Sequence, residues 1–218
     1  EMSREQLTTR MLCSQAKVDM QKVNSGETTE EDLLVLSDAL LTLSDSKMYI
    51  DDSGNLSVAD IRSRCRRQQT RYGLDLVVID YLGLLQLGSK RGSLVADIAE
   101  ATRALKILAK ELEVPIMLLC QLSRKCEERI DKRPVLSDLR DSRNNEQDAD
   151  VVVMLYRDEY YNPNSQDKGI AEILIRKNRQ GKTGVVPLAF IGDQTRFEVL
   201  SREWTQSSQD EKPKKRGF

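Results

Sequence analysis

The chain has 218 residues, and its 34 Lys and Arg side chains nearly balance its 35 Asp and Glu side chains, for a net charge of −1. The length and an apolar content of 39% suit one folded domain with a substantial core. The near-neutral balance excludes a polybasic, histone-like protein, so nucleic acid would have to be bound by local basic patches. No apolar run approaches the ~20 residues of a membrane span and no secretory signal opens the chain, so we expect no membrane partner.

The absence of His and the spacing of the cysteines exclude further kinds of active site. His is absent, which excludes Ser-His-Asp and Cys-His nucleophilic sites and His-ligated metals. The four cysteines show no CxxC spacing, which favours reduced thiols in a cytoplasmic protein. The first residue is Glu1 and not Met, so we expect the chain to be part of a longer polypeptide.

Helical periodicity dominates the first third of the chain. Residues 3–16 are predicted to form a helix that Ser3 and Gln6 begin with a capping box. A polar loop is expected over 22–29, and a short strand over 48–51. A second helix over 29–43 places four leucines on one face: Leu33, Leu36, Leu40 and Leu43. A third begins at Ser57, with Val58, Ile61 and Cys65 pointing inward and Arg62, Arg64, Arg66 and Arg67 outward.

Apolar strands and a long helix follow. The run 74–79 does not alternate, which is typical of a strand buried on both faces in a parallel sheet. A helix is predicted over 93–113, with an inner face of Leu94, Ile98, Ala101, Leu105, Leu108 and Leu112. Further strands are expected over 116–120, 151–156, 170–176, 185–191 and 195–199. This order predicts an α/β fold with a mostly parallel sheet and antiparallel C-terminal edge strands, spanning 1–204, followed by a polar tail over 205–218.

Single polar residues stand where the predicted strands end, which is where ligands bind in such sheets. Asp80 could hold the water shell of a Mg²⁺ ion that bridges nucleotide phosphates, although by itself a strand-end Asp more often caps a turn. Gln121 could report a γ-phosphate, or be an ordinary turn residue. Lys177 and Arg179 share one face of a strand and could stabilise a phosphoryl group, or only protect an edge strand.

The segment from Arg124 to Arg143 is rich in both charges and has no aromatic residue, so it favours phosphate contact over base stacking, or is a solvated loop. A phosphate-binding G-x-x-x-x-G-K-[ST] loop occurs nowhere in the sequence. Gly181, Lys182 and Thr183 match only its last three positions, and Arg176 occupies the place of the first Gly.

Six segments, in order, carry a specific resemblance: EMSREQL (1–7), VVIDYLGLL (77–85), IAEATRALKILAKELEVPI (98–116), QLSRKCEERIDKRPVLSDLRDS (121–142), EQDADVVVMLYRDEYY (146–161) and KGIAEILIRKNRQGKTG (168–184). From Glu1 to about Val199 the chain resembles the C-terminal motor domain of DnaB-type replicative DNA helicases. The resemblance implies a RecA-like three-layer core that assembles as a homo-hexamer around single-stranded DNA and unwinds duplex DNA at the replication fork, using ATP and Mg²⁺. It implies a cytoplasmic, bacterial, phage or organelle-type replication compartment.

The resemblance also assigns roles. Glu1 matches the glutamate that polarises the attacking water, Asp80 the residue that orders Mg²⁺, and Gln121 the sensor that links the γ-phosphate to the DNA-binding loops. Lys177 and Arg179 match the pair that reaches the neighbouring subunit's nucleotide. The DNA-binding candidates are Arg140, Asp141, Arg143, Arg124, Lys90 and Arg91. Arg143 departs from the family pattern, in which a small residue is usual, so a side chain there would replace a backbone contact to phosphate.

The family's phosphate-binding loop, and the N-terminal collar that binds primase and the helicase loader, lie upstream of the matched region. We therefore expect no ATP hydrolysis by the 218 residues alone. Two alternatives stay open: another RecA-like ATPase, such as a recombinase or ring-forming regulator, and a non-catalytic DNA-binding or scaffold module. The QLSR and SDLRDS segments argue against the first.

Overall fold

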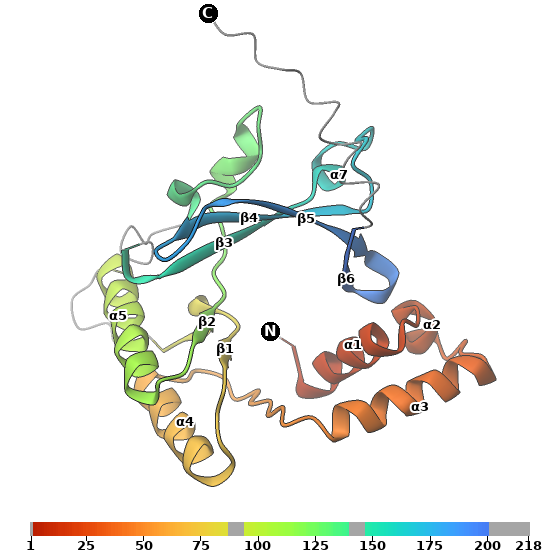
Figure 1. Ribbon diagram of the computed structural model, residues 1–218, viewed down its shortest axis with the longest axis horizontal. Helices are drawn as coiled ribbons and strands as arrows, with labels where there is room; N and C mark the ends of the chain where they lie inside the picture. Colours follow the sequence, from red (N-terminus) through yellow and green to blue (C-terminus); the bar gives the residue numbers. More distant parts are fainter. Residues whose placement is uncertain (1, 87–93, 140–146, 201–218) are drawn as a thin grey trace, which may run out of the picture. The chain divides into compact units, whose positions relative to one another are not determined.

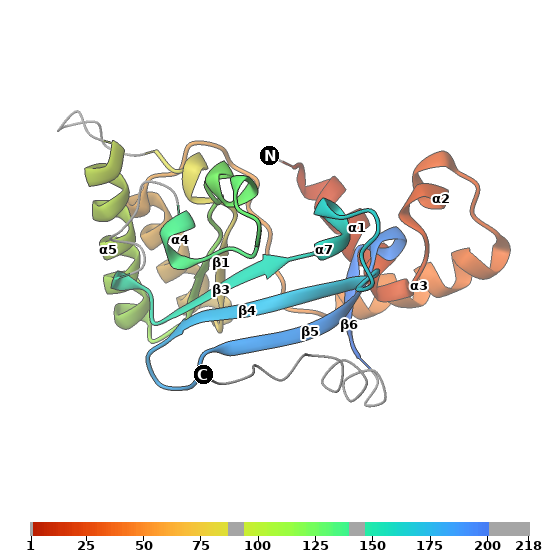
Figure 2. The same cartoon turned by 90° about the horizontal axis from the view of Figure 1, so that it is seen from above.

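A computed structural model of the chain describes residues 2–86, 94–139 and 147–200. The chain divides into two compact units. The first comprises Glu1–Asp52, Arg157–Ile173 and Val185–Phe218, and the second comprises Ser53–Tyr156 and Leu174–Gly184. Figures 1 and 2 show the elements in two perpendicular views. Among the described residues, no helix has both the length and the apolar character that crossing a bilayer requires.

Three helices begin the first unit: α1 (Arg4–Ala16), α2 (Met20–Ser25) and α3 (Glu30–Ser44). Capping boxes at Ser3 and Thr29 start α1 and α3, as the sequence predicts for the first of them, because each side chain accepts a hydrogen bond from an otherwise unpaired N–H. The expected loop over 22–29 is partly wrong. The Asp19 carboxylate caps Gln21 N–H at 2.7 Å and begins a short helix that Gly26 ends at a φ of 76°.

The inner face of α3 also differs from the prediction. Leu36 and Ala39 are buried, whereas Leu33 and Leu40 are 55% and 50% exposed. A narrow buried stripe is consistent with the main packing partner of α3 among the described elements, α1, whose Cys13 is fully buried. The short strand expected over 48–51 does not form.

The first unit also holds α7 (Asp158–Tyr161), η4 (Gly192–Gln194) and β6 (Arg196–Val199). β6 pairs antiparallel with β5 (Gly184–Ile191), in a register that joins Leu188 to Val199 and Ile191 to Arg196. The hydrogen-bonded order of the four-stranded sheet is β3 (Val151–Tyr156), β4 (Ile170–Asn178), β5 and β6. The expected antiparallel pairing near the C-terminal end is present in β5 and β6.

The second unit builds its core between two helices and a parallel strand pair. α4 (Val58–Tyr72) packs on α5 (Leu94–Leu112), and α5 packs on β2 (Ile116–Leu118), which pairs in parallel with β1 (Val77–Ile79). Figure 1 shows α4 and α5 beside this pair. The buried core residues are Ile61, Cys65, Ile79, Leu105, Leu108, Leu112 and Val114. The predicted inner faces are confirmed for Ile61, Cys65, Leu105, Leu108 and Leu112 by this set, and Ile98 and Ala101 are buried as well. Val58 is only half-buried, and the side chain of Leu94 lies outside the description.

The prediction of a strand buried on both faces is wrong for the described residues. β1 has three residues, of which only Ile79 is buried, and Val78 is 55% exposed. The helices cover one face of the two-stranded sheet, so alternate side chains stay outside the core. β3 (Val151–Tyr156) alternates in the same way, with Val152, Met154 and Tyr156 buried.

The remaining elements of this unit are short helical turns and the end of a long strand. They are η1 (Leu82–Leu84), η2 (Arg124–Glu128), η3 (Leu136–Asp138) and the second half of β4 (Ile170–Asn178). All four cysteines of the chain are free thiols.

Candidate functional site

Asp80 and Gln121 follow the two parallel strands at the same edge of the sheet. β1 and β2 pair in register from Val77 with Ile116 to Ile79 with Leu118. The ladder continues past the strands, because Leu119 N–H donates to Ile79 O and Leu82 N–H donates to Leu119 O, both at 3.0 Å. The strand register therefore brings the Asp80 and Gln121 segments together. Both side chains are exposed, as groups that meet a ligand must be.

The segment after Gln121 is folded back by a buried ion pair. Arg129 donates to both carboxylate oxygens of Asp138, at 2.7 and 2.6 Å, and the Asp138 side chain is only 4% exposed. Val135 N–H also donates to this carboxylate, at 2.9 Å. The Arg129 guanidinium is the main cause that holds the pKa of Asp138 below its usual range, with the Val135 bond adding to it.

This clamp of Arg129 and Asp138 connects two predicted site segments. Ser123 N–H donates to Asp138 O at 2.8 Å, and Leu122 and Leu139 form an isolated antiparallel bridge. The residues beside Gln121 are thereby bonded to the residues just before Arg140. Arg124, a candidate DNA contact, begins η2 within the same loop and is exposed.

Lys177 and Arg179, near the end of β4, bond to one short segment of their own unit. Both side chains donate to Gln147 O, Lys177 Nζ at 3.4 Å, which agrees with their expected common face. Arg179 also donates from Nη1 to Asp150 Oδ1 at 3.1 Å, and its N–H donates to Asp150 O at 2.9 Å. The other oxygen of Asp150 bonds Lys106 Nζ of α5.

Six predicted site residues lie outside the described residues: Glu1, Lys90, Arg91, Arg140, Asp141 and Arg143. Their roles stay predictions.

Sequence reasoning missed the charged residues that hold the site segments in place. Arg129, Asp138, Lys106 and Asp150 each lie in a charge-rich stretch, so the sequence gives no sign of which pairs form. Of these four residues, only Asp150 could have been singled out from the sequence. It is a charged residue directly before a hydrophobic strand, which places it at the end of a strand.

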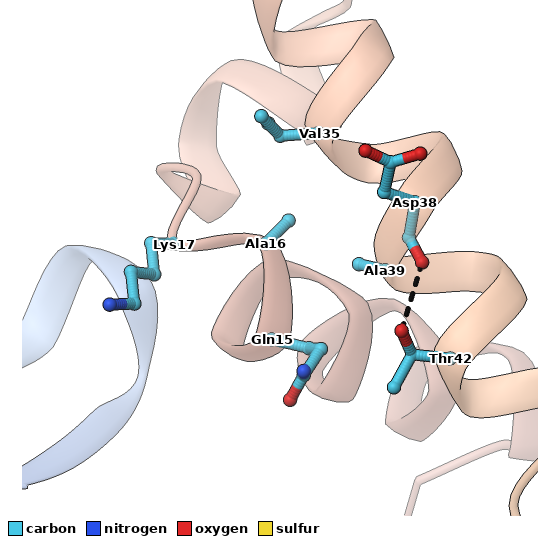
Figure 3. A pocket seen from close by; sticks show the side chains of 7 residues that line it. All are labelled: Gln15, Ala16, Lys17, Val35, Asp38, Ala39 and Thr42. Carbon is cyan, nitrogen blue, oxygen red and sulfur yellow. Dashed lines mark hydrogen bonds between the residues drawn. The ribbon is translucent and has the colours of Figure 1, made fainter.

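A pocket between α1 and α3 lies in the first unit and contains none of the predicted site residues (Figure 3). Its lining is Gln15, Ala16, Lys17, Val35, Asp38, Ala39 and Thr42. The Thr42 hydroxyl is engaged with Asp38 O of its own helix, at 3.1 Å. In the described parts of the chain, no three Cys, Asp or Glu side chains are grouped closely enough to form a metal cage.

Comparison with known proteins identifies the family. The model of the DnaB-like helicase C terminal domain matches residues 1–199. The chain belongs to this family. Two solved structures share its fold with a TM-score of 0.88, 39% identity and 92% of this chain covered. One is described as an ATPase domain, of which 72% is covered, and the other as a DnaB-like replicative helicase and its interactions with primase, of which 49% is covered. The RecA-like α/β class expected for this family is confirmed by these neighbours.

Curated relatives agree with this assignment. The replicative DNA helicase DnaB of Geobacillus stearothermophilus is 46% identical over 208 residues, which are 95% of this chain and 46% of the relative. The replicative DNA helicase DnaC of Bacillus subtilis (strain 168) is 44% identical over 205 residues, 94% of this chain and 45% of the relative. The chain thus spans about half the length of these DnaB-family relatives.

Proposed function

We propose that this chain is part of the motor of a replicative DNA helicase, in which ATP hydrolysis at subunit interfaces drives translocation on single-stranded DNA and strand separation. The observation that carries the proposal is the β1–β2 register, which brings the Asp80 and Gln121 segments to one sheet edge in a chain that matches the DnaB-like family over residues 1–199. Proteins named replicative DNA helicase are 44–46% identical to it.

Asp80 suits the proposed Mg²⁺ ion. In nucleotide sites Mg²⁺ keeps several waters and takes one or two protein carboxylates together with phosphate oxygens, so one exposed carboxylate at a strand end is sufficient. When bound, the ion would neutralise charge on the phosphates. The exposed Gln121 amide would sense the γ-phosphate from the neighbouring strand end, and Glu1 would orient the attacking water.

Lys177 and Arg179 would complete the nucleotide site of an adjacent subunit in a homo-hexamer. Arg has five N–H donors, and the contacts within the described residues use two on the Arg179 side chain, which leaves donors for phosphoryl oxygens. Arg140, Asp141, Arg143, Arg124, Lys90 and Arg91 would contact the DNA backbone. A primase is a proposed partner, because one structural neighbour is described by its interactions with primase, and a helicase loader is a second.

A non-catalytic DNA-binding module is the second candidate. It is favoured by one observation, that the 218 residues contain no G-x-x-x-x-G-K-[ST] loop to hold the nucleotide phosphates. ATPase activity therefore requires a phosphate loop from outside these residues.

The test compares ATPase activity of the full-length gene product with and without single-stranded DNA, and unwinding of a forked duplex. Asp80→Asn should lower the DNA-stimulated rate by about 100-fold or more, since it removes the carboxylate that orders the proposed ion. Asp75→Asn changes an exposed carboxylate at the opposite end of β1 and should leave the rate unchanged. Binding of single-stranded DNA without ATPase activity would favour the second candidate, and a DNA-independent ATPase would contradict both.

A further inference from the structure

Asp150 lies at a junction of three segments of the second unit. Its two carboxylate oxygens bond different cations, Lys106 Nζ from α5 and Arg179 Nη1 from the end of β4. Figure 2 shows the start of β3, which Asp150 precedes, beside α5. The pKa of Asp150 lies below its ordinary value, mainly because of the hydrogen bond from Lys106, and Arg179 lowers it further. The carboxylate is therefore charged at neutral pH and bonded on both sides.

The segment around Asp150 also approaches α5 at a second point. Thr102 lies one turn before Lys106 and is buried, and its hydroxyl lies 3.2 Å from Ala99 O of its own helix and 3.5 Å from Asp148 Oδ2. Gln147, in the same segment, supplies the carbonyl that accepts from both Lys177 and Arg179. Residues 147–150 thus connect α5 with the two cations. In the sequence they come directly after 140–146, the segment proposed to contact DNA.

We propose that Asp150 is a positioning residue for Arg179, which it orients from within the same subunit so that the remaining guanidinium donors face the neighbouring subunit's nucleotide. This inference rests on the proposed function. Its geometric support is a pair of hydrogen bonds between the two residues. The Arg179 N–H donates to Asp150 O and Arg179 Nη1 donates to Asp150 Oδ1, so the backbone and the side chain of Arg179 are held by the same residue. Lys106 fixes the carboxylate in turn.

The contact pattern favours positioning over inhibition. Contacts with the described residues engage two of the five Arg179 side-chain donors, and the side chain is 48% exposed. A contact that held Arg179 away from a ligand would engage more donors or bury the group. An oriented guanidinium instead loses little freedom when it binds phosphate, which is how a fixed side chain increases a catalytic rate.

The experiment uses the full-length gene product with Asp150→Asn, which keeps the shape of the side chain and removes its charge, and Asp150→Glu, which keeps the charge. Asp193→Asn is the matched control, because it removes one exposed carboxylate in η4. The first measurement is phenylglyoxal modification of Arg179, followed by peptide mass spectrometry. Asp150→Asn should increase the modification rate about two- to fivefold, the range that an exposed ion pair supports, and Asp193→Asn should not.

The second measurement is DNA-stimulated ATPase kinetics. Asp150→Asn should lower kcat about tenfold with KM for ATP within about twofold, because an interaction made in the transition state is lost and ground-state binding is kept. Asp150→Glu should recover part of kcat. A structural role would instead lower the thermal midpoint and change kcat and KM together. Lys106→Gln should change labelling and kcat in the same direction by less, and it serves as the test if Asp150→Asn does not fold.

Each outcome decides the inference. Unchanged Arg179 labelling in Asp150→Asn overturns the contact itself, whatever the activity. Changed labelling with an unchanged or increased kcat overturns the positioning role while the proposed function stands. If Asp150→Asn changes the labelling of Arg179 but the wild-type protein has no ATPase activity, the proposed function is overturned, and the positioning role of Asp150 with it.

Discussion

The clamp of Arg129 and Asp138 shows how one buried pair can determine the path of a loop. Asp138 is almost fully enclosed, so its charge depends on Arg129 and on the Val135 N–H for compensation. Arg129 additionally donates to Arg133 O at 3.0 Å, which closes the turn from the other side. Because Leu122 and Leu139 bridge beside it, this clamp keeps the chain next to Gln121 paired with the chain that ends at Leu139.

Arg129→Met should destabilise the protein by about 2–3 kcal/mol, because it leaves a buried carboxylate without its cation. The value is below the ~3–5 kcal/mol of fully buried pairs, since the Arg129 side chain is 35% exposed. Chemical denaturation with a two-state fit measures the loss. Lys17→Ala is the control, because its pair with Glu198 spans 3.9 Å between exposed side chains and should cost less than about 0.5 kcal/mol. If Arg129→Met lost as little unfolding free energy as the control, the clamp would not stabilise the protein.

The same clamp makes stability depend on pH in a defined direction. The pKa of Asp138 is lower in the folded protein than its ordinary value of about 3.9, so the unfolded chain binds the proton first. The contribution of the ion pair to the unfolding free energy is fully present at a pH above this ordinary pKa, and it is lost as the pH falls toward the pKa of the folded protein. Asp138→Asn should therefore flatten the decrease of the unfolding free energy below about pH 4, measured against wild type at pH 3–7. If the unfolding free energies of Asp138→Asn and wild type fell in parallel as the pH decreased, the Arg129–Asp138 pair would not be the source of the pH dependence.

At the scale of elements, α5 is the central element of the second unit. Leu108 is 1% exposed and faces the core, whereas Ile107, the residue before it, is 57% exposed. Leu108→Ala should cost about 3 kcal/mol, the lost burial plus the cavity, and Ile107→Ala should cost less than about 1 kcal/mol. Thermal or denaturant unfolding of the two single variants checks this difference. Similar losses would show that the orientation of α5 is not as described.

Helices could be predicted from the sequence more completely than strands or site contacts. The apolar spacing of α5 determines its buried face because one stripe of leucines satisfies a single packing surface. α2 was missed because a six-residue helix has too few turns for periodicity to register, and its start depends on one Asp19 bond. β1 was predicted as buried on both faces because an apolar run does not reveal which side receives a neighbour.

The residues of the candidate site also differ in how far the sequence alone could predict them. Asp80 and Gln121 could be predicted because a strand end is a local property of the sequence. The contact of Asp150 with Arg179 joins residues 29 positions apart, and the contact of Asp150 with Lys106 joins residues 44 apart, so only the fold brings them together. Many other charge pairs were equally compatible with the sequence, since about a third of the residues are charged.

For the whole molecule, the balance of charge determines how DNA could be bound. A net charge of −1 over these 218 residues gives them no long-range attraction to a polyanion, so under the proposed function their contact with DNA would come from a few local cations. Arranged in a ring, the same weak contact would be repeated by every subunit, which increases the overall affinity without a basic surface. Assembly would also bring Arg179 of one subunit to the nucleotide of the next.

This arrangement predicts complementation between inactive subunits. Arg179→Ala and Asp80→Asn full-length proteins should each lack DNA-stimulated ATPase activity. When they are mixed at equal amounts and allowed to exchange, about a quarter of the interfaces of a closed ring would receive an intact Asp80 from one variant and an intact Arg179 from the other. Steady-state ATPase assays should therefore recover a fraction of wild-type activity. The double variant mixed with either single variant should recover none, since no interface then combines the two intact residues. Equal inactivity of all mixtures, in rings shown by mass to contain both variants, would indicate that Arg179 serves the nucleotide of its own subunit.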